Sequence, residues 1–278
     1  MSGVETVNAR GGSPVEMVRV LEADPELASQ LSPSMLEAAV AQAIAPLLRL
    51  EPRLWAPDFE ERATHGHLGL LVLDGLIARH MRFGQVGSTE LLGPRDLIRP
   101  WRRPTSRTHA PEMRWEVLAP SQLAVLDRDF ALRVRPWPEI VAVVLERGSR
   151  RADSLLLQAA LRQAVRVEDR LLLALWHFAD RWGEDAGEGW KIRIPRLTGE
   201  ILANIVGARR QTVSTALGQL ADRRAISRGK DGMWTLLQRP SQMDSIQVGR
   251  RASDHIALLG DEPASEALES SPESLPTP

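Results

Sequence analysis

Four residues in the C-terminal third have side chains that can form hydrogen bonds with the edges of base pairs. Arginine and glutamine can each form two such bonds, and serine and threonine can also contact bases. All four lie near the start of a predicted helix over residues 210–222, in two pairs spaced four residues apart. In helix-turn-helix proteins the start of such a helix enters the major groove. We therefore predict that these side chains read bases in double-stranded DNA: Arg210, Gln211, Ser214 and Thr215.

Two further cations follow in a segment with the pattern of a two-stranded wing. One predicted strand begins at residues 225–227 and a second covers residues 233–237, with a turn containing two glycines between them. The turn region carries Arg228 and Lys230. Cationic side chains at this place are suited to DNA phosphates.

The apolar pattern predicts two short helices that would position these side chains. Thr198 is suited to cap the first helix, and Glu200 lies in its first turn, where the helix dipole favours a negative charge. Gly207 can adopt a positive φ and end that helix. Two short helices joined by a glycine turn form a helix-turn-helix, which the wing extends to a winged helix. The predicted inward residues are Ile201, Leu202, Ile205 and Val206, followed by Val213, Ala216, Leu217 and Leu220.

The charge distribution agrees with a nucleic-acid partner. The whole chain has a formal net charge of −1, but residues 190–237 contain nine basic and three acidic residues. After Arg251 the chain has six acidic residues and no Lys or Arg. A locally basic segment followed by an acidic tail indicates nucleic-acid binding. Two alternatives stay open at this point: the basic helices form a solvated surface, or the winged helix binds a protein.

Composition excludes several other classes of protein. The 278 residues are 43% hydrophobic and 26% charged, which is typical of globular domains. There is no apolar run of about eighteen residues and no apolar region near the start, so we expect neither a membrane span nor a signal peptide. Cysteine is absent, which excludes disulfides, thiolate zinc sites and cysteine nucleophiles. We expect a cytoplasmic protein.

Ahead of the basic segment, the pattern predicts a helix, then strands, then long helices. Residues 33–50 have apolar residues at helical spacing, and short strands separated by turns follow from about residue 55. Asp74-Gly75 predicts a hairpin turn, and further turns are expected at residues 84–87 and 119–121. This pattern indicates a small antiparallel roll or barrel. From Pro138, helical periodicity lasts about forty residues; it suits either a dimerisation helix or a core helix packed on the roll.

The stretch from Leu197 to Ile226 resembles the C-terminal domain of the cyclic AMP receptor protein/FNR (Crp/Fnr) family of bacterial transcription regulators. The resemblance covers roughly residues 47–237. It implies an α+β fold with a cyclic-nucleotide-binding-like β-roll (jelly roll), a long dimerisation helix and a winged helix-turn-helix. It also implies a homodimer on a pseudo-palindromic operator. The expected division is a flexible leader (1–30), a roll sensor domain (31–135), dimerisation and connecting helices (136–182), a DNA-binding domain (190–238) and a disordered acidic tail (240–278).

The resemblance also implies roles for individual residues. Arg210 matches the arginine that pairs with guanine. Gln211 stands where many relatives have Glu, and Thr215 where many have a second Arg, so we expect a different half-site. Phosphate contacts are implied for Thr198 and Thr212, and Arg209 replaces a customary capping residue and adds a phosphate contact.

The residues that bind a cyclic nucleotide in the family are absent from the roll. Pro100 stands where the ribose-binding Glu is expected, and Pro111-Glu112 falls near the position of the phosphate-binding Arg-Ser pair. Proline removes an N–H donor and a glutamate repels a phosphate. We therefore predict no control by conventional cAMP, and the effector is unknown. Arg99, with Arg102 and Arg103, suits either another anion or surface and inter-domain contacts.

Other residues that could do chemistry do not form a recognisable site. His65-Gly66-His67 lacks a third metal ligand, and His80 and His177 lie among apolar residues, so all are interpreted as structural. Adjacent Glu60 and Glu61 need not face one site, and no phosphate loop or nucleophile motif is present. We expect no enzyme activity, metal, cofactor or membrane partner. The expected partners are double-stranded DNA and a second copy of the chain, with RNA polymerase or another protein as a further candidate.

Overall fold

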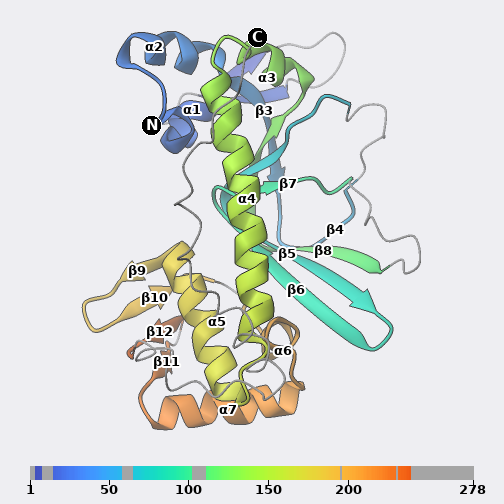
Figure 1. Ribbon diagram of the computed structural model, residues 1–278, viewed down its shortest axis with the longest axis vertical. Coiled ribbons are helices and arrows are strands. Elements are labelled where there is room, and N and C mark those ends of the chain that lie inside the picture. Colours follow the sequence, from blue (N-terminus) through green and yellow to red (C-terminus); the bar gives the residue numbers. More distant parts are fainter. Residues whose placement is uncertain are drawn as a thin grey trace, which may run out of the picture.

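The structure is a computed structural model that describes residues 4–7, 15–57, 65–101, 111–194, 196–229 and 231–238. An antiparallel roll is followed by long helices and then by a winged helix (Figure 1). Its sheet follows the order β1-β2-β3-β8-β5-β6, with β4 on β8 and β7 on β5. The strands are β1 (Val4–Val7), β2 (Val15–Arg19), β3 (Ile44–Leu50), β4 (Leu54–Trp55), β5 (Gly69–Phe83), β6 (Val86–Leu92), β7 (Leu97–Ile98) and β8 (Glu112–Leu126).

Helices pack on the roll and connect it to the C-terminal end of the molecule. In Figure 1, α4 runs along the length of the molecule, from the end that carries α1, α2 and α3 to the end that carries α6 and α7. The helices of this part are α1 (Val20–Ala23), the 3-10 helix η1 (Pro25–Ala28), α2 (Pro33–Gln42), α3 (Arg128–Arg133), α4 (Pro138–Leu161) and α5 (Val167–Trp182). The long helical region predicted from Pro138 is thus confirmed, as two helices.

The two longest strands correct the predicted turns. Instead of a hairpin at Asp74-Gly75, β5 continues through these residues and pairs with β8, with shifts of register there. β8 likewise continues through residues 119–121. Gly75 has a φ of 93°, and a Cβ there would overlap Ser121 and Pro120 of the facing strand. The two predicted turns therefore face each other as one irregularity in a continuous ladder, which is typical of a β-bulge. The turn at residues 84–87 is confirmed between β5 and β6.

The N-terminal predictions also need correction. The helix predicted over residues 33–50 ends at Gln42, and β3 takes up its second half because this segment pairs with β2 and β8. Residues 1–30 were expected to form a flexible leader, but residues 4–7 form β1 and residues 15–28 form β2, α1 and η1. Val20 and Leu27 are completely buried in a cluster with Phe130 and Ile140. We refer to residues 15–28 as the N-terminal segment; its burial anchors it to α4.

The C-terminal part combines helices with a small antiparallel sheet, order β11-β12-β10-β9. Its elements are β9 (Gly183–Asp185), β10 (Trp190–Ile192), α6 (Gly199–Val206), α7 (Arg210–Asp222), β11 (Ile226–Arg228) and β12 (Trp234–Leu236). Residues 183–189, predicted as a link, instead form a hairpin with β10 that enlarges the wing sheet. The α+β fold with a roll, long helices and a C-terminal winged helix is as predicted. Within the described residues, no helix is both long enough and apolar enough to cross a membrane.

Candidate nucleic-acid interface

The first helix of the pair, α6, has well-defined ends. Thr198 Oγ1 accepts a hydrogen bond from the Ile201 N–H at 3.2 Å, so the predicted cap is confirmed. Gly207 ends the helix in the left-handed region, at a φ of 65°. The predicted inward residues of α6 are all buried. These local features fix the turn that leads into α7.

The second helix, α7, separates apolar from polar side chains. Val213, Ala216 and Leu220 are buried and Leu217 is partly buried, as predicted. At 3.6 residues per turn, the centre of the opposite face lies near Gln211. The predicted base-contacting residues are all exposed on or beside this face: Arg210, Gln211, Ser214 and Thr215. The structure therefore brings these four side chains together.

Individual side chains on this face have different partners. The Thr215 hydroxyl donates to the Gln211 carbonyl at 3.2 Å, which leaves its oxygen able to accept. Arg210 has no side-chain hydrogen bond or ion pair to any described residue. A hollow of about 420 Å³ runs between α7 and the start of α5, lined by Gln211, Thr215 and the carboxylate-bearing Glu168. Glu168 is mostly buried and lies 3.8 Å from Arg166, so this side of the hollow carries an ion pair, whereas Gln211 and Thr215 provide uncharged hydrogen-bonding groups.

The predicted phosphate contacts surround this face. Thr198, Arg209 and Thr212 are exposed, and Arg209 precedes α7 without a side-chain cap, as predicted. In the wing, Arg228 Nε donates to the Gly232 carbonyl at 3.3 Å, and its guanidinium lies 5.2 Å from the Trp234 ring centroid. This contact directs the cation along the wing. Lys230 lies outside the described residues.

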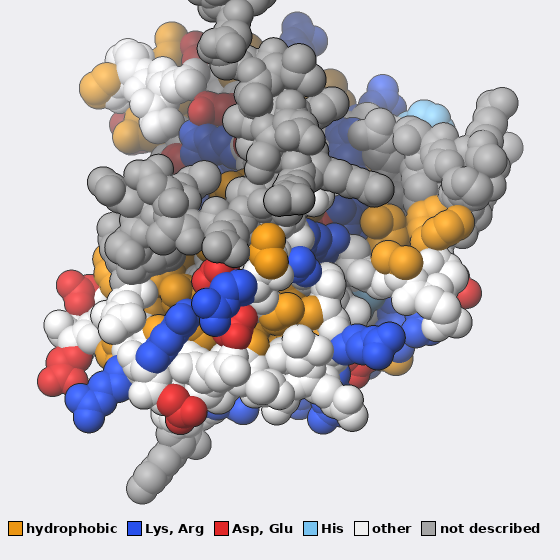
Figure 2. Space-filling model, turned by 60° about the horizontal axis from the view of Figure 1, so that its bottom comes forward, with side chains coloured by type: hydrophobic (Ala, Val, Ile, Leu, Met, Phe, Trp, Pro, Cys, Tyr) orange, Lys and Arg blue, Asp and Glu red, His pale blue; other side chains and the backbone are white. Residues whose placement is uncertain are grey.

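Some of the positive charge counted in the sequence is neutralised within the fold. Lys191 Nζ lies 2.6 Å from Asp231 Oδ2, and Arg193 Nε lies 2.8 Å from Glu184 Oε2. These pairs belong to the wing sheet and do not involve α7. Figure 2 turns this end of the molecule forward and shows Lys and Arg side chains spread among uncharged ones, with acidic side chains between them. Among the described basic residues of this segment, those outside these two ion pairs are Arg196 before α6 and the arginines at and after α7.

Sequence reasoning missed three residues at this surface. Gly218 lies on the exposed face of α7, and a Cβ there would meet nothing within 4 Å. Arg196 and Arg224 are exposed and have positive φ values of 61° and 56°. The basic count of the segment included both arginines, but nothing in the local pattern predicted a left-handed backbone. Gly218 was detectable as a glycine inside a helix, where it is unfavourable.

Two partly buried arginines hold α6 in place. Arg162 donates from Nε to the Ile205 carbonyl at 2.7 Å and from Nη2 to the Asn204 carbonyl at 3.1 Å and to Ser88 Oγ at 2.8 Å. Arg170 Nη1 donates to the Val206 carbonyl at 3.5 Å. Cations suit the C-terminal end of a helix, whose carbonyls are unpaired. Burial lowers the pKa of Arg162, but it remains charged. The helix-turn-helix is thereby tied to α4 and to strand β6 of the roll.

The described interior of the roll is apolar. Its core is filled by apolar side chains, including Leu70, Ile98, Trp115 and Leu123. Arg99 donates from Nε to the Leu68 carbonyl at 2.6 Å and from Nη2 to the His67 carbonyl at 3.0 Å. Arg102 and Arg103 lie outside the described residues. Arg99 therefore links the end of β7 to the segment that precedes β5.

Two histidines, His80 and His177, have polar partners inside the protein. His80 lies between Thr89 Oγ1 (2.9 Å) and Glu116 Oε2 (3.3 Å), and His177 lies 2.8 Å from Ser154 Oγ. Burial is the main cause that lowers the pKa of both imidazoles. In the described part of the chain, no three His, Asp or Glu side chains are grouped to hold a metal ion. Glu60 and Glu61 lie outside the described residues.

The fold and this surface define a winged helix-turn-helix protein with an N-terminal β-roll. Residues 169–241 match the family model of the Crp-like helix-turn-helix domain. A search of curated proteins finds no match. The resemblance to the Crp/Fnr family is thus confirmed for the helix-turn-helix domain, and the matched domain begins within α5.

Solved structures share the fold over most of the chain. A mutant of CooA from Carboxydothermus hydrogenoformans is 18% identical with a TM-score of 0.54, covering 78% of this chain and 91% of that chain. A cyclic nucleotide-binding domain containing protein from Listeria monocytogenes is 15% identical with a TM-score of 0.54, covering 76% and 96%. A CRP family transcriptional regulator from Thermus thermophilus is 18% identical with a TM-score of 0.50, covering 69% and 92%.

Proposed function

We propose that this protein is a homodimeric transcription regulator that binds a pseudo-palindromic DNA operator through α7. The observation that carries the proposal is the division of α7 into a buried apolar face and an exposed polar face. The exposed face presents Arg210, Gln211 and Ser214 near the helix start. A helix with this division, held on a winged domain that matches the Crp-like family model, suits the major groove.

The side chains divide into two roles in this proposal. Arg210 pairs with guanine, Gln211 pairs with adenine, and Ser214 and Thr215 complete the contacts with bases. Thr198, Arg209, Thr212, Arg228 and Lys230 hold the DNA backbone on either side.

The proposed dimer forms through α4. Leu145 and Leu156 are 66% and 71% exposed, which is unusual for large apolar side chains on a long helix. With Ala152 they lie on one side of α4, at helical spacing. Pairing two such helices buries this stripe and places two copies of α7 on one face of the DNA.

We further propose that control by conventional cAMP is absent, because Pro100 and Glu112 stand near the positions expected to bind the ribose and the phosphate. Glu112 remains exposed at the start of β8, where a cation would be needed for the phosphate. The proposed role is that of a regulator and not of an enzyme. No effector follows from these residues.

The direct test is selection of bound duplexes from a random DNA pool with the purified full-length protein, without ligand. The expected result is an enriched inverted repeat whose half-sites lie about one helical turn apart. A matched selection with the Arg210→Ala variant should lose the preference at one position of each half-site. If the wild-type protein enriches no sequence, the proposal of sequence-specific binding by the free dimer is wrong. A winged helix that contacts a protein partner, such as RNA polymerase, would then be favoured.

A further inference from the structure

A cavity of about 610 Å³ lies where the roll, the N-terminal segment, α4 and α5 meet. This volume is typical of small-molecule sites. The roll contributes the turn between β6 and β7, and the N-terminal segment contributes Glu26. None of the residues assigned to DNA contact lines the cavity. It is therefore separate from the proposed nucleic-acid interface.

The cavity faces away from the proposed dimer contact. Arg147 and Arg151 line it from α4. At 3.6 residues per turn, these positions lie on the opposite side of α4 from Leu145 and Leu156. A dimer formed through the leucine stripe thus leaves the cavity side of α4 free of the partner helix.

Arg95 lines the cavity and has an unfavourable backbone conformation. Its φ is 74°, in the left-handed region that a glycine adopts without a steric penalty. The side chain is 68% exposed, and Nη1 lies 3.3 Å from Glu26 Oε2. A guanidinium has five N–H donors, so this ion pair leaves most of its hydrogen-bonding capacity available. Strained residues with free binding capacity often mark functional sites.

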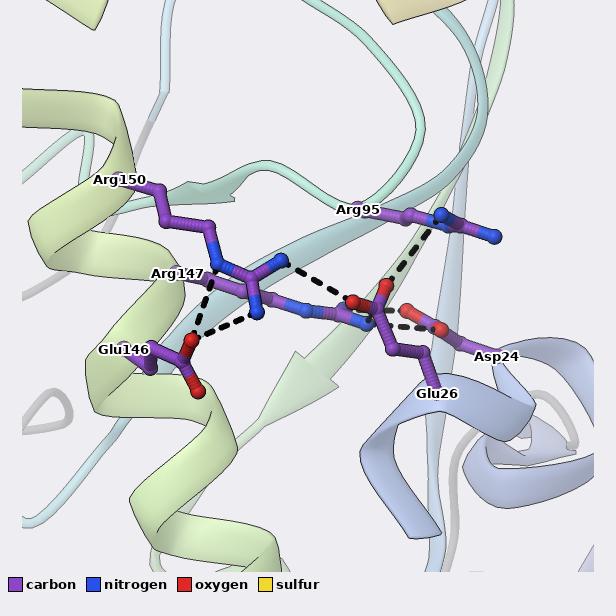
Figure 3. Close-up of polar contacts among 6 residues, drawn as sticks. All are labelled: Asp24, Glu26, Arg95, Glu146, Arg147 and Arg150. Atoms are coloured by element: carbon purple, nitrogen blue, oxygen red, sulfur yellow. Dashed lines mark hydrogen bonds and ion pairs between the residues drawn. The ribbon is translucent and has the colours of Figure 1, made fainter. Parts of the chain in front are cut away.

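A second exposed arginine reaches the same carboxylate from α4. Arg150 is 56% exposed and donates from Nη1 to Glu26 Oε1 at 3.1 Å. Figure 3 shows Arg95 and Arg150 approaching Glu26 from different elements, with Arg147 beneath them. Arg147 is buried and is held by both oxygens of Asp24. Arg147 also donates to Glu26 Oε2 at 3.2 Å, and Arg150 donates to Glu146 on its own helix. Arg147 is thus a fixed structural cation, whereas Arg95 and Arg150 are the exposed cations that reach the same acid.

We propose that this cavity binds a small polyanion, a phosphate compound or a polycarboxylate, through Arg95 and Arg150, and that the ligand displaces Glu26. The planar guanidinium groups match the oxygen spacing of both anion types. Asp153 and Asp180 also line the cavity and repel any anion, so a ligand has to attract the arginines more strongly than the Glu26 carboxylate does. A ligand with two or more negative charges can replace the single carboxylate and still attract both arginines.

The cavity is connected to the DNA-binding domain by an ion pair. Arg181 of α5 donates from Nη2 to both oxygens of Asp96, at 2.7 and 2.6 Å, and Asp96 follows Arg95 in the turn. The Gly93 N–H also donates to Asp96 Oδ2, at 2.8 Å. A ligand that shifts this turn therefore acts on α5. This regulatory part of the inference rests on the proposed function, whereas binding of the anion does not.

Calorimetric titration of the full-length protein without DNA tests the binding. Pyrophosphate and citrate serve as separate probes, at constant ionic strength. We expect saturable binding of at least one probe, with about tenfold or greater loss of affinity in Arg95→Gly, because a charge-assisted contact is removed. Glycine fits the observed φ, so this variant should unfold at a temperature no lower than the wild type. Binding of pyrophosphate alone would identify a phosphate ligand, and binding of citrate alone a carboxylate ligand.

Arg224→Gly is the matched control, because it also replaces an exposed arginine at positive φ. Its affinity for the probe should equal that of the wild type. The proposal is overturned if neither probe binds saturably at millimolar concentration, or if Arg95→Gly binds as tightly as the wild type.

A second measurement separates regulation from binding. The affinity for the selected operator is measured with and without the bound probe, in the wild type and in Arg95→Gly. A change in the wild type alone supports regulation through the cavity, and no change in either protein overturns it. If no operator is selected at all, the proposed function fails while the calorimetric result stands.

Discussion

The arginines of α7 and the arginines between the roll and α4 have opposite surroundings. Arg209 and Arg210 are exposed, with no side-chain hydrogen bond or ion pair to the described part of the chain. Arg147 is 5% exposed and paired with Asp24, and Arg151 binds both oxygens of Glu90 at 2.6 and 2.9 Å. One residue type therefore serves two purposes. Inside the molecule, arginines form ion pairs that join distant segments. At the start of α7, the arginine charge remains available to bind another molecule.

The largest expected effect tests the internal side of this comparison. Arg147→Met leaves Asp24 buried without its partner, and breaking a buried pair in this way costs about 3–5 kcal/mol. Urea denaturation of the wild type and the variant measures the loss in the free energy of unfolding. Arg209→Met is the control, and an exposed substitution of this kind should change stability by less than about 0.5 kcal/mol. Equal losses in the two variants would show that the distinction is wrong.

A smaller effect is expected where an internal arginine supports the DNA-binding helices. Arg162→Met removes the donors to the Ile205 and Asn204 carbonyls, and because this site is only partly buried the loss should be about 1–3 kcal/mol in total. Relative to the wild type, amide hydrogen exchange in the variant should become faster in α6. It should stay unchanged in α3, which Arg162 does not contact. Unchanged exchange in α6 would mean that Arg162 does not position this helix.

On the exposed face of α7, one substitution should separate stability from binding. Gly218→Ala introduces a better helix former into open space and should raise the free energy of unfolding by about 0.5–1 kcal/mol. The same methyl group lies on the face proposed for the groove, so operator affinity should fall. Thermal unfolding and a binding titration measure the two quantities. If the variant is more stable and still binds DNA as tightly as the wild type, the DNA does not contact this face of α7.

The smallest expected effect concerns pH. Burial lowers the pKa of His177, with a further contribution from Arg181, whereas the unfolded chain has the ordinary value of about 6.5. Below that pH the unfolded state binds more protons, so this group reduces stability as pH falls, until the folded imidazole is protonated as well. His177→Gln should therefore lose less stability than the wild type between pH 7 and pH 5. Denaturation curves at both values measure the difference, and an equal loss would contradict it.

The sequence predicted the C-terminal end of the molecule because the determining features are local. The Thr198 cap, the left-handed Gly207 and the buried Val213 and Leu220 depend on neighbours within a few turns of helix. The exposure of the polar face of α7 follows from the same period. Gly218 and the left-handed Arg196 were missed, since neither is required by the helix pattern.

The roll was less predictable because distant residues decide its structure. Asp74-Gly75 has the composition of a hairpin turn, but pairing with residues 119–122 keeps the strand continuous. The segment after Gln42 has helical spacing, yet it becomes β3 because a strand partner is available. Likewise, Arg147 and Asp24 are separated by 123 positions, so their pairing cannot be read from local spacing.

The most direct test of base reading by α7 compares two variants on two duplexes. Arg210→Ala and Arg228→Ala are titrated with the selected operator and with a scrambled duplex over a range of salt concentrations. Arg210→Ala should lose about 1–3 kcal/mol on the operator and little on the scrambled duplex. Arg228→Ala should weaken both evenly and reduce the salt dependence by about one unit of slope. If the two variants change both duplexes in the same way, α7 does not read bases through Arg210.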